Sequence, residues 1–217
     1  MKKIISITIL LITSFVFFSC VSVEGKKDIN VLHDIQKKDK YNADVKMPVF
    51  SNEKTLNSLI TNQITDWFNA FEVEIPENKK GDFYVDWQLK EYSSEVISVL
   101  LSAYIHTGGA NGEDKMAGFN WDIKNQKLIT LDEILPKITK HPDLQTLSDL
   151  CRAQLRVTLD IEDNSFLVQT INEGTIPVAD NFQIFTITPL GVSFYFPKYQ
   201  VAPGSYGTQE VFLPFIK

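Results

Sequence analysis

Several residue types in this chain could perform chemistry, but their spacing does not assemble a reactive centre. The histidines at positions 33, 106 and 141 lie far apart and form neither an HExxH motif nor a metal-ligand spacing. The acidic run over 160–164 lacks the glycine and the closing glutamate of a calcium loop, so we interpret it as a solvated helix junction. There is no GxSxG elbow or phosphate loop, and no carboxylate pair is singled out for glycoside chemistry. The sequence therefore predicts no catalytic residue, no metal site and no cofactor.

Cys20 is a candidate site of lipid attachment. Two lysines at the start of the chain precede an apolar run over 4–18, and Ser19 follows it. This order is typical of a secretory signal, and the run is shorter than the ~20 residues of a membrane-spanning helix. We therefore expect a lipoprotein signal peptide over 1–19. A plain cleaved signal or an uncleaved anchor is the alternative.

The residues before Cys20 resemble a lipobox, although Phe17 and Phe18 replace the usual leucine and small residue. The resemblance implies that Cys20 is acylated and holds the protein on a membrane, because several acyl chains anchor a protein almost permanently. Val21 follows the cysteine, so the aspartate that retains some lipoproteins in the inner membrane is absent. This favours the outer membrane or the periplasmic face over the exterior of the cytoplasmic membrane.

The charge and composition narrow the class of protein. Without Lys2 and Lys3 the formal net charge falls from −6 to −8, which argues against a nucleic-acid partner and suits a cationic one. Residues 20–40 are polar and lysine-rich, and we expect them to form a flexible tether in which His33 is solvated. Residues 41–217 are enough for a single domain, and at 44 % hydrophobic residues the chain is globular.

Five segments of the first half show clear periodicity. Residues 41–50 alternate between apolar and polar and predict a strand. A helix is expected over 53–72, with Ser51 or Asn52 as its cap, Glu53 in its first turn, and apolar residues at three- and four-residue spacing. Three more alternating runs predict an antiparallel meander whose apolar face the helix covers. Their apolar residues are Phe83, Val85, Trp87 and Leu89; then Ile97, Val99, Leu101, Ala103 and Ile105; then Ala117, Phe119, Trp121 and Ile123.

The second half begins with helices and ends in strands. A capping box from Thr130 to Glu133 starts a short helix that Pro136 is expected to interrupt. A longer helix follows from about Pro142, with Cys151 buried in its apolar stripe, and one more short helix is predicted over 163–172. The predicted strands are 182–188, 192–196 and 210–215, with a hairpin at 189–191. The expected fold class is α+β: a mainly antiparallel sheet with helices packed on one face, in a single domain.

Two segments, Val96–Leu135 and Phe185–Pro214, carry a family resemblance. The first contains Ile97-Ser98-Val99, Tyr104-Ile105-His106-Thr107-Gly108-Gly109-Ala110-Asn111-Gly112, Asn120-Trp121-Asp122 and Leu128-Ile129-Thr130-Leu131. The second contains Gly191-Val192-Ser193-Phe194-Tyr195-Phe196, Tyr199-Gln200-Val201-Ala202-Pro203-Gly204, Gly207 and Glu210-Val211. They resemble the DUF3298/RsiV-like family, whose domain usually follows a DUF4163-type half. Residues 41–107 fit that half more loosely.

The resemblance implies a cell-envelope protein whose shared domain has no established chemistry. The family includes the extracellular domain of an anti-sigma factor that binds lysozyme, the non-catalytic half of a peptidoglycan deacetylase, and uncharacterised lipoproteins. We expect this chain to be a non-enzymatic binding module for a lysozyme-like envelope protein or a peptidoglycan-derived glycan. A structural or assembly lipoprotein that partners another envelope protein, and an unrecognised wall hydrolase, are the alternatives.

Two loops are candidate binding regions. One is the glycine loop, residues 107–112, with Thr107, Gly108, Gly109 and Asn111. Relatives often have histidine where Asn111 stands, and asparagine also suits a left-handed turn. The other loop carries Tyr199, Pro203 and Tyr206, because exposed tyrosines are favoured at interfaces. Alternatively, both loops are turns whose side chains only fill local packing.

Overall fold

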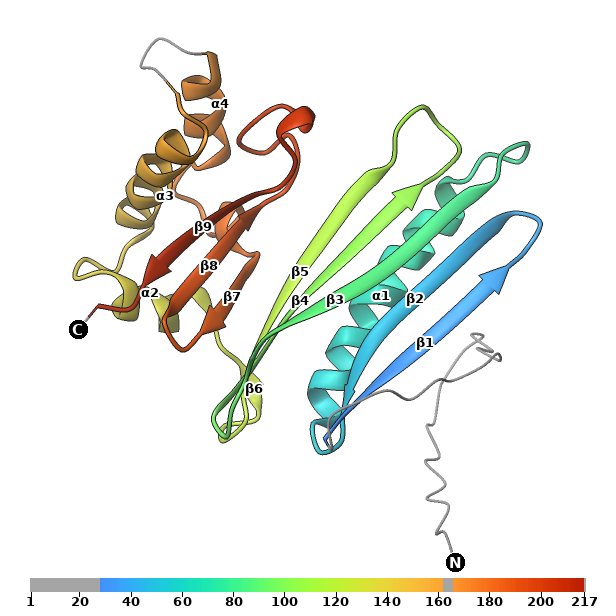
Figure 1. The fold of residues 1–217 in the computed structure, drawn as a ribbon, viewed down its shortest axis with the longest axis horizontal. Helices are drawn as coiled ribbons and strands as arrows, with labels where there is room; N and C mark the ends of the chain where they lie inside the picture. Colours follow the sequence, from blue (N-terminus) through green and yellow to red (C-terminus); the bar gives the residue numbers. More distant parts are fainter. Residues whose placement is uncertain (1–27, 162–165, 217) are drawn as a thin grey trace, which may run out of the picture.

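The computed structural model describes residues 28–161 and 166–216, which form two sheets and four α-helices (Figure 1). The six-stranded sheet contains, in spatial order, β1 (Ile29–Lys37), β2 (Tyr41–Phe50), β3 (Gly81–Tyr92), β4 (Val96–His106), β5 (Glu113–Asp122) and β6 (Lys127–Leu128). The three-stranded sheet contains β7 (Phe185–Thr188), β8 (Gly191–Phe196) and β9 (Gln209–Pro214). The helices are α1 (Lys54–Glu74), α2 (Leu131–Ile138), α3 (Leu144–Thr158) and α4 (Phe166–Gly174). The fold is α+β, as predicted.

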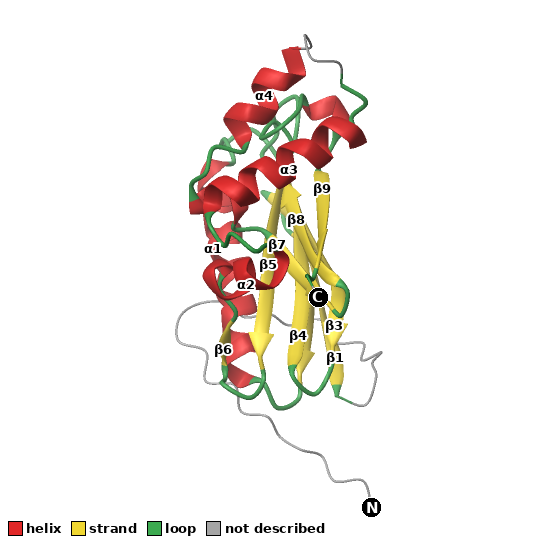
Figure 2. Ribbon diagram, turned by 90° about the vertical axis from the view of Figure 1, so that its left-hand side faces the viewer, coloured by secondary structure: helices red, strands yellow, loops and turns green. Residues whose placement is uncertain are grey.

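Helix α1 covers one face of the six-stranded sheet (Figure 2). Its buried residues are Leu56, Ile60, Ile64, Trp67, Phe68 and Phe71, which is the stripe that the helical spacing predicts. They pack on the inward residues of β2–β5, including Phe83, Leu101 and Trp121. Because α1 connects β2 to β3 as a crossover, these two strands are parallel, whereas all other neighbours are antiparallel. None of the described helices combines the length and apolar character that a membrane crossing requires.

The three-stranded sheet packs with α2, α3 and α4 around a second hydrophobic cluster, separate from that of the six-stranded sheet. Asp143 caps α3 by accepting a hydrogen bond from the Thr146 backbone N–H at 2.8 Å, and the capping box of Thr130 and Glu133 starts α2. Cys151 is fully buried in this cluster. Burial raises the pKa of its thiol to about 12, so the group stays protonated and unreactive.

The two sheets are joined by a small polar cluster that we call the inter-sheet joint. Strand β7 packs against the outer face of β3, β4 and β5, which is the face opposite α1. The Asn120 side chain accepts from Ser98 Oγ at 2.7 Å and from the Ile187 backbone N–H at 3.0 Å, and its Nδ2 donates to the Phe185 carbonyl at 2.8 Å. A Cβ at Gly118 would lie 2.1 Å from the same carbonyl oxygen, so glycine is required for this approach.

The prediction that residues 20–40 form a flexible tether is wrong for residues 29–37. Residues 29–37 form β1, which pairs with β2 along its whole length, and Ile29 and Asp34 are buried. His33 is not simply solvated, because its Nε2 lies 2.7 Å from Asp44 Oδ1. Strand β1 has too many polar residues to show alternation, and its stability comes from its partner. The predicted signal over 1–19 and Cys20 lie outside the described residues.

Four local predictions also need correction. The N-cap of α1 is Glu53, not Ser51 or Asn52, and its carboxylate faces inward instead of capping the helix. Helix α2 continues past Pro136 to its end at Ile138. Strand β7 begins at Phe185, because residues 179–182 form a short 3-10 helix. The strands form two sheets with two clusters, whereas the sequence suggested one.

Candidate functional site

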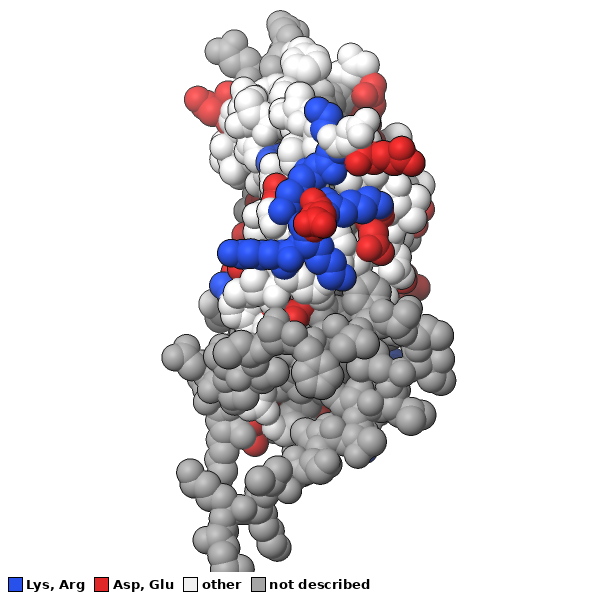
Figure 3. All heavy atoms as spheres, turned by 90° about the vertical axis from the view of Figure 1, so that its right-hand side faces the viewer, with Lys and Arg blue, Asp and Glu red and all other residues white. Residues whose placement is uncertain are grey.

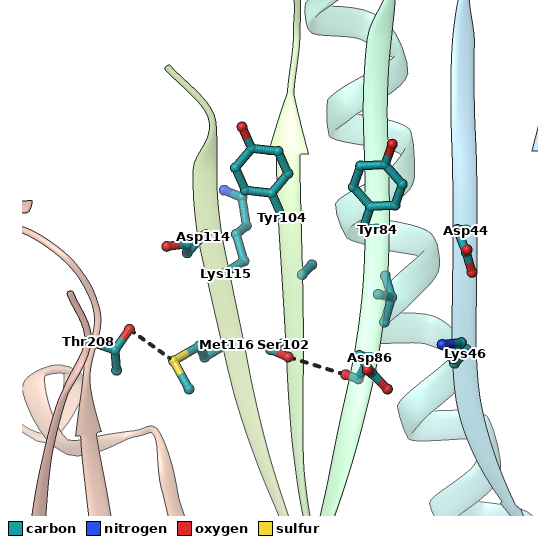
Figure 4. Close-up of a pocket in the computed structure, with 12 residues that line it drawn as sticks. Asp44, Lys46, Tyr84, Asp86, Ser102, Tyr104, Asp114, Lys115, Met116 and Thr208 are labelled. Atoms are coloured by element: carbon teal, nitrogen blue, oxygen red, sulfur yellow. Dashed lines mark hydrogen bonds between the residues drawn. The ribbon is translucent and has the colours of Figure 1, made fainter.

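Strand β7 covers only part of the outer face of the six-stranded sheet, and the same face contains a hollow of about 370 Å³ (Figure 4). We call it the tyrosine hollow. It is lined by Asp44, Lys46, Tyr84, Val85, Asp86, Ser102, Ala103, Tyr104, Asp114, Lys115, Met116 and Thr208. All of these except Thr208 lie on β2–β5, while Thr208 comes from the loop between β8 and β9. The hollow therefore lies at the junction of the two sheets, where ligand sites often occur.

Strand register explains why these residues meet. Tyr104 lies opposite Tyr84 on β3 and opposite Asp114 on β5, and Tyr84 lies opposite Asp44 on β2. The next outward row contains Asp86, Ser102 and Met116. Residues on one row of a sheet point to the same side. The rows beyond, at Leu100 and Ser98, lie under β7, so the hollow begins where that cover ends.

Two tyrosines form the platform of the hollow. The rings of Tyr84 and Tyr104 are stacked with centroids 6.3 Å apart and an interplanar angle of 21°, and the residues are 43 % and 41 % exposed. Gly112 leaves the space for the Tyr104 ring, since a Cβ there would lie 2.4 Å from Cζ of that ring. The platform therefore depends on Gly112, the last residue of the glycine loop. Gly112 leaves space for Tyr104 but does not itself line the hollow.

Carboxylates surround the platform and are themselves held by neighbours. Asp82 accepts from Asn42 Nδ2 at 2.9 Å and from the Tyr84 hydroxyl at 3.3 Å, and His106 Nδ1 lies 3.8 Å from it. Burial raises the pKa of Tyr84, and the charges of Asp82 and Asp44 raise it further. The Tyr84 hydroxyl therefore stays protonated at neutral pH and can donate a hydrogen bond.

The loop between β8 and β9 closes one side of the hollow. Lys198, at the start of this loop, forms an ion pair with Asp114 on β5. Its hydrogen bond and charge interaction with Asp114 raise the pKa of Lys198. At the other end of the loop, the Thr208 hydroxyl donates to Met116 Sδ at 3.7 Å (Figure 4). The second half of the chain thus contributes the charge of Lys198 and the lining residue Thr208 to a site that lies mainly on the first half.

The predicted glycine loop is the turn between β4 and β5, and its named residues do not line the hollow. Gly108 has a φ of 88° and lies against Lys79, while the Gly109 carbonyl oxygen is 2.9 Å from His106 Nε2. Asn111 is exposed and does not have a positive φ, so the left-handed residue of this turn is Gly108 and not Asn111. Thr107 is half-buried and directly follows the end of β4.

The second predicted loop, which carries Tyr199, Pro203 and Tyr206, is held near the hollow by the residues on either side of it, Lys198 and Thr208. Tyr199 is 73 % exposed and directly follows Lys198, and Tyr206 is also exposed. The Pro203 carbonyl accepts from the Tyr206 backbone N–H at 2.9 Å and shapes the turn. Tyr199 therefore does not simply fill packing. Since Lys198 binds Asp114, which follows the glycine loop, the structure brings the two predicted loops to the same end of the molecule.

The residues of the hollow itself were not singled out by the sequence. Tyr84 and Tyr104 stand at outward positions of predicted strands, among charged residues such as Asp82 and Asp86. An aromatic residue on the polar side of an amphipathic strand is the signal that could have found them. Among the described residues, no group of three or more histidine, cysteine, aspartate or glutamate side chains is placed to hold a metal ion.

Replacing Gly112 by alanine is expected to displace the Tyr104 ring and abolish its stacking on Tyr84. The ring is the flexible partner in this contact, so we expect the free energy of unfolding to change by less than ~1 kcal/mol. Ring-proton NMR shifts of the two tyrosines measure the stacking. Gly109→Ala is the matched control, because a Cβ at Gly109 would meet nothing within 4 Å. Unchanged tyrosine shifts in Gly112→Ala would contradict the described support.

Comparisons with known proteins match both halves of the chain. Residues 35–114 match the family model described as "Deacetylase PdaC", and residues 137–215 match "Protein of unknown function (DUF3298)". Over 177 residues the chain is 28 % identical to the peptidoglycan-N-acetylmuramic acid deacetylase PdaC of Bacillus subtilis (strain 168). This alignment covers 79 % of the chain but only 37 % of that relative, so the chain spans little more than a third of its length.

Solved structures show the same fold. A DUF3298 family protein of Pseudomonas aeruginosa PAO1 superposes with a TM-score of 0.67 at 15 % identity, covering 87 % of this chain and 94 % of that one. A DUF3298 family member of Bacteroides fragilis NCTC 9343 has a TM-score of 0.61 at 14 % identity, covering 89 % and 92 %. The resemblance seen in the sequence is confirmed: this chain carries a PdaC-like domain in its first half and a DUF3298 domain in its second.

Proposed function

We propose that this chain is a non-catalytic binding domain of the cell envelope that holds a peptidoglycan-type glycan at the tyrosine hollow. The observation that carries the proposal is the exposed Tyr84–Tyr104 platform, surrounded by hydrogen-bonding groups of both kinds. The two matched domains and the related peptidoglycan deacetylase point to an envelope-associated protein. The proposal includes the lipid anchor at Cys20, which would hold the domain at a membrane surface.

The chemistry of the hollow suits a sugar. A pyranose ring presents apolar C–H faces that pack on aromatic rings, and its hydroxyl and acetamido groups both donate and accept hydrogen bonds. Tyr84 and Tyr104 supply the apolar surface. Asp44 and Asp86 accept hydrogen bonds, and Lys46, which Figure 4 shows pointing from β2 toward Asp86, donates them. A few convergent polar groups around an apolar floor are typical of small-ligand sites.

The bonding of the carboxylates favours binding over catalysis. Glycoside hydrolysis commonly uses two carboxyl groups, one protonated and one ionised, on either side of the reacting bond. Here Asp44 contacts His33, Asp82 binds Asn42 and Tyr84, and Asp114 pairs with Lys198. Groups tied in this way suit the positioning of a ligand better than proton transfer.

The proposal is tested by titrating the protein calorimetrically with N-acetylglucosamine oligomers and soluble muropeptides. Removing a stacking ring by Tyr84→Ala or Tyr104→Ala is expected to weaken glycan binding about tenfold or more. Tyr92→Ala is the matched control, because Tyr92 is 39 % exposed on the same strand as Tyr84 but at its far end. Equal affinity of all three variants and the wild type, or no affinity for any saccharide, would refute the proposal.

A cationic envelope protein such as a lysozyme is the second candidate ligand. The observation that favours it is the acidic balance, a formal net charge of −6, together with the aspartates around the hollow. Figure 3 shows, on the side of the molecule where β1 and β2 lie, a central group of basic side chains with acidic ones among and beside them. Binding of lysozyme that weakens steeply between low and high salt, without glycan affinity, would favour this candidate.

A further inference from the structure

A third exposed tyrosine, Tyr199, has an unusual backbone conformation and directly follows Lys198, which is ion-paired with Asp114 of the tyrosine hollow. Tyr199 has a φ of 71°, a left-handed value that is rare for residues other than glycine, asparagine and aspartate. Such strained positions persist only where the surroundings enforce them, and they concentrate at functional sites. An aromatic residue that is 73 % exposed in this conformation gains little from burial, so stability of the fold does not explain its placement.

The ring of Tyr199 occupies space that a side chain at position 204 would fill, as the ring of Tyr104 does at position 112. A Cβ at Gly204 would lie 2.4 Å from Cζ and Oη of Tyr199, so the ring lies close to the Gly204 backbone. The backbone N–H of Tyr199 donates to the Ala202 carbonyl at 3.1 Å, and Ala202 is buried. The exposed ring is therefore presented on a fixed turn, which reduces the entropy cost of using it to bind a ligand.

The Lys198–Asp114 ion pair lies between this tyrosine and the platform. Asp114 is directly opposite Tyr104 in the β4–β5 register, and Lys198 directly precedes Tyr199. Asp114 is the main cause of the raised pKa of Lys198, with smaller contributions from Tyr199 and Tyr104. Both tyrosines are thus within electrostatic range of the same ammonium group, one on each half of the chain.

We propose that the binding site continues from the Tyr84–Tyr104 platform across the Lys198–Asp114 ion pair to Tyr199, and that it takes an extended oligosaccharide strand. This inference rests on the proposed function and specifies its ligand as a chain of several sugar units. Each tyrosine offers one apolar face for one sugar ring. The ion pair between them offers a donor and an acceptor for the hydroxyl and acetamido groups of the intervening unit.

Both halves of the chain are needed for such a site. The platform belongs to strands β3 and β4, whereas Tyr199 and Lys198 belong to the loop after β8. A single sugar unit would contact the platform alone, and its binding would not require the second half. A longer strand would gain affinity from the second half, which explains why an ion pair and the Thr208–Met116 contact hold the loop against β5.

The test is calorimetric titration of the full chain with N-acetylglucosamine oligomers of two to six units, in the wild type and in Tyr199→Asn. Asparagine tolerates the left-handed conformation, so this variant removes the ring and keeps the turn. In the wild type we expect affinity to rise about three- to tenfold from the shortest to the longest oligomer. In Tyr199→Asn this gain should disappear while the affinity for the disaccharide stays unchanged. Tyr199→Phe should behave as the wild type.

The matched control is Leu190→Asn, since Leu190 is 75 % exposed in the hairpin at the opposite end of β8. It should leave the length dependence intact. If the wild type binds all lengths equally, or if Tyr199→Asn retains the full gain, the extended site is overturned while binding at the platform stands. If no oligomer of any length binds, the proposed glycan function itself fails, and the extension fails with it.

Discussion

Replacing Asn120 by leucine is expected to lower the free energy of unfolding by about 3 kcal/mol, although the two side chains are similar in size. Asn120 is buried and makes three hydrogen bonds in the inter-sheet joint, to Ser98, Phe185 and Ile187. Leucine would leave the Ser98 O–H without an acceptor and the Phe185 carbonyl without its donor, both in a buried space. The Ile187 N–H keeps its bond to Ser98 Oγ at 2.9 Å, so the loss is smaller than three bonds would suggest.

Urea unfolding followed by both fluorescence and far-UV circular dichroism measures this loss. We also expect the two probes to separate in the variant, because weakening the joint lets each hydrophobic cluster unfold on its own. Asn111→Leu is the control, since Asn111 is exposed in the glycine loop. A loss below ~1 kcal/mol for Asn120→Leu would show that the joint does not hold the sheets together.

Removing the Glu53 carboxylate is the second change with a large expected effect. Glu53 is buried at the N-terminus of α1, where it accepts from Trp121 Nε1 at 2.7 Å and from Gln126 Nε2 at 2.9 Å. Glu53→Ala leaves the indole N–H of a buried tryptophan unsatisfied and removes a negative charge from a helix N-terminus. Together these effects should cost about 2–4 kcal/mol.

Thermal unfolding of Glu53→Ala, compared with Glu53→Gln, separates the two contributions. Glutamine keeps an acceptor for the Trp121 indole and removes only the charge, so it should recover more than half of the loss. Glu74→Ala is the control, because Glu74 is an exposed glutamate at the other end of the same helix. Equal destabilisation by alanine and glutamine would mean that the charge, and not the hydrogen bond, holds this end of α1.

Strong periodicity made most elements of the fold predictable. Helix α1 and strands β2–β5 bury an apolar face at regular spacing, so this spacing reports the structure directly, although β4 and β5 also bury Ser98, Leu100 and Asn120 on the other face. The capping box of α2 and the hairpin between β7 and β8 depend on local turn chemistry and were also predicted correctly. Strand β1 was missed because its pairing partner, and not its own pattern, makes it a strand.

The candidate site was less predictable because it depends on how distant segments meet. The sequence indicated the Tyr199 loop, which borders the hollow. It also indicated the glycine loop, but this loop does not line the hollow and only leaves space, at Gly112, for the Tyr104 ring. Tyr84 and Asp44 are forty residues apart and become neighbours only through the parallel β2–β3 register. The packing of the two sheets against each other depends on the close approach at Gly118, where a glycine within a predicted strand was the available sign.

The inter-sheet joint also has a consequence for the order of assembly during synthesis. All strands of the first sheet, together with α1, come from residues 29–128, so this half can close its cluster before the second half leaves the ribosome. Until β7 docks, the face that carries Leu100 and Asn120 would stay open to solvent, and the nascent protein would expose an adhesive surface. Thr208 would then be the last residue to complete the lining of the tyrosine hollow, so a truncated or stalled chain would lack a complete binding site.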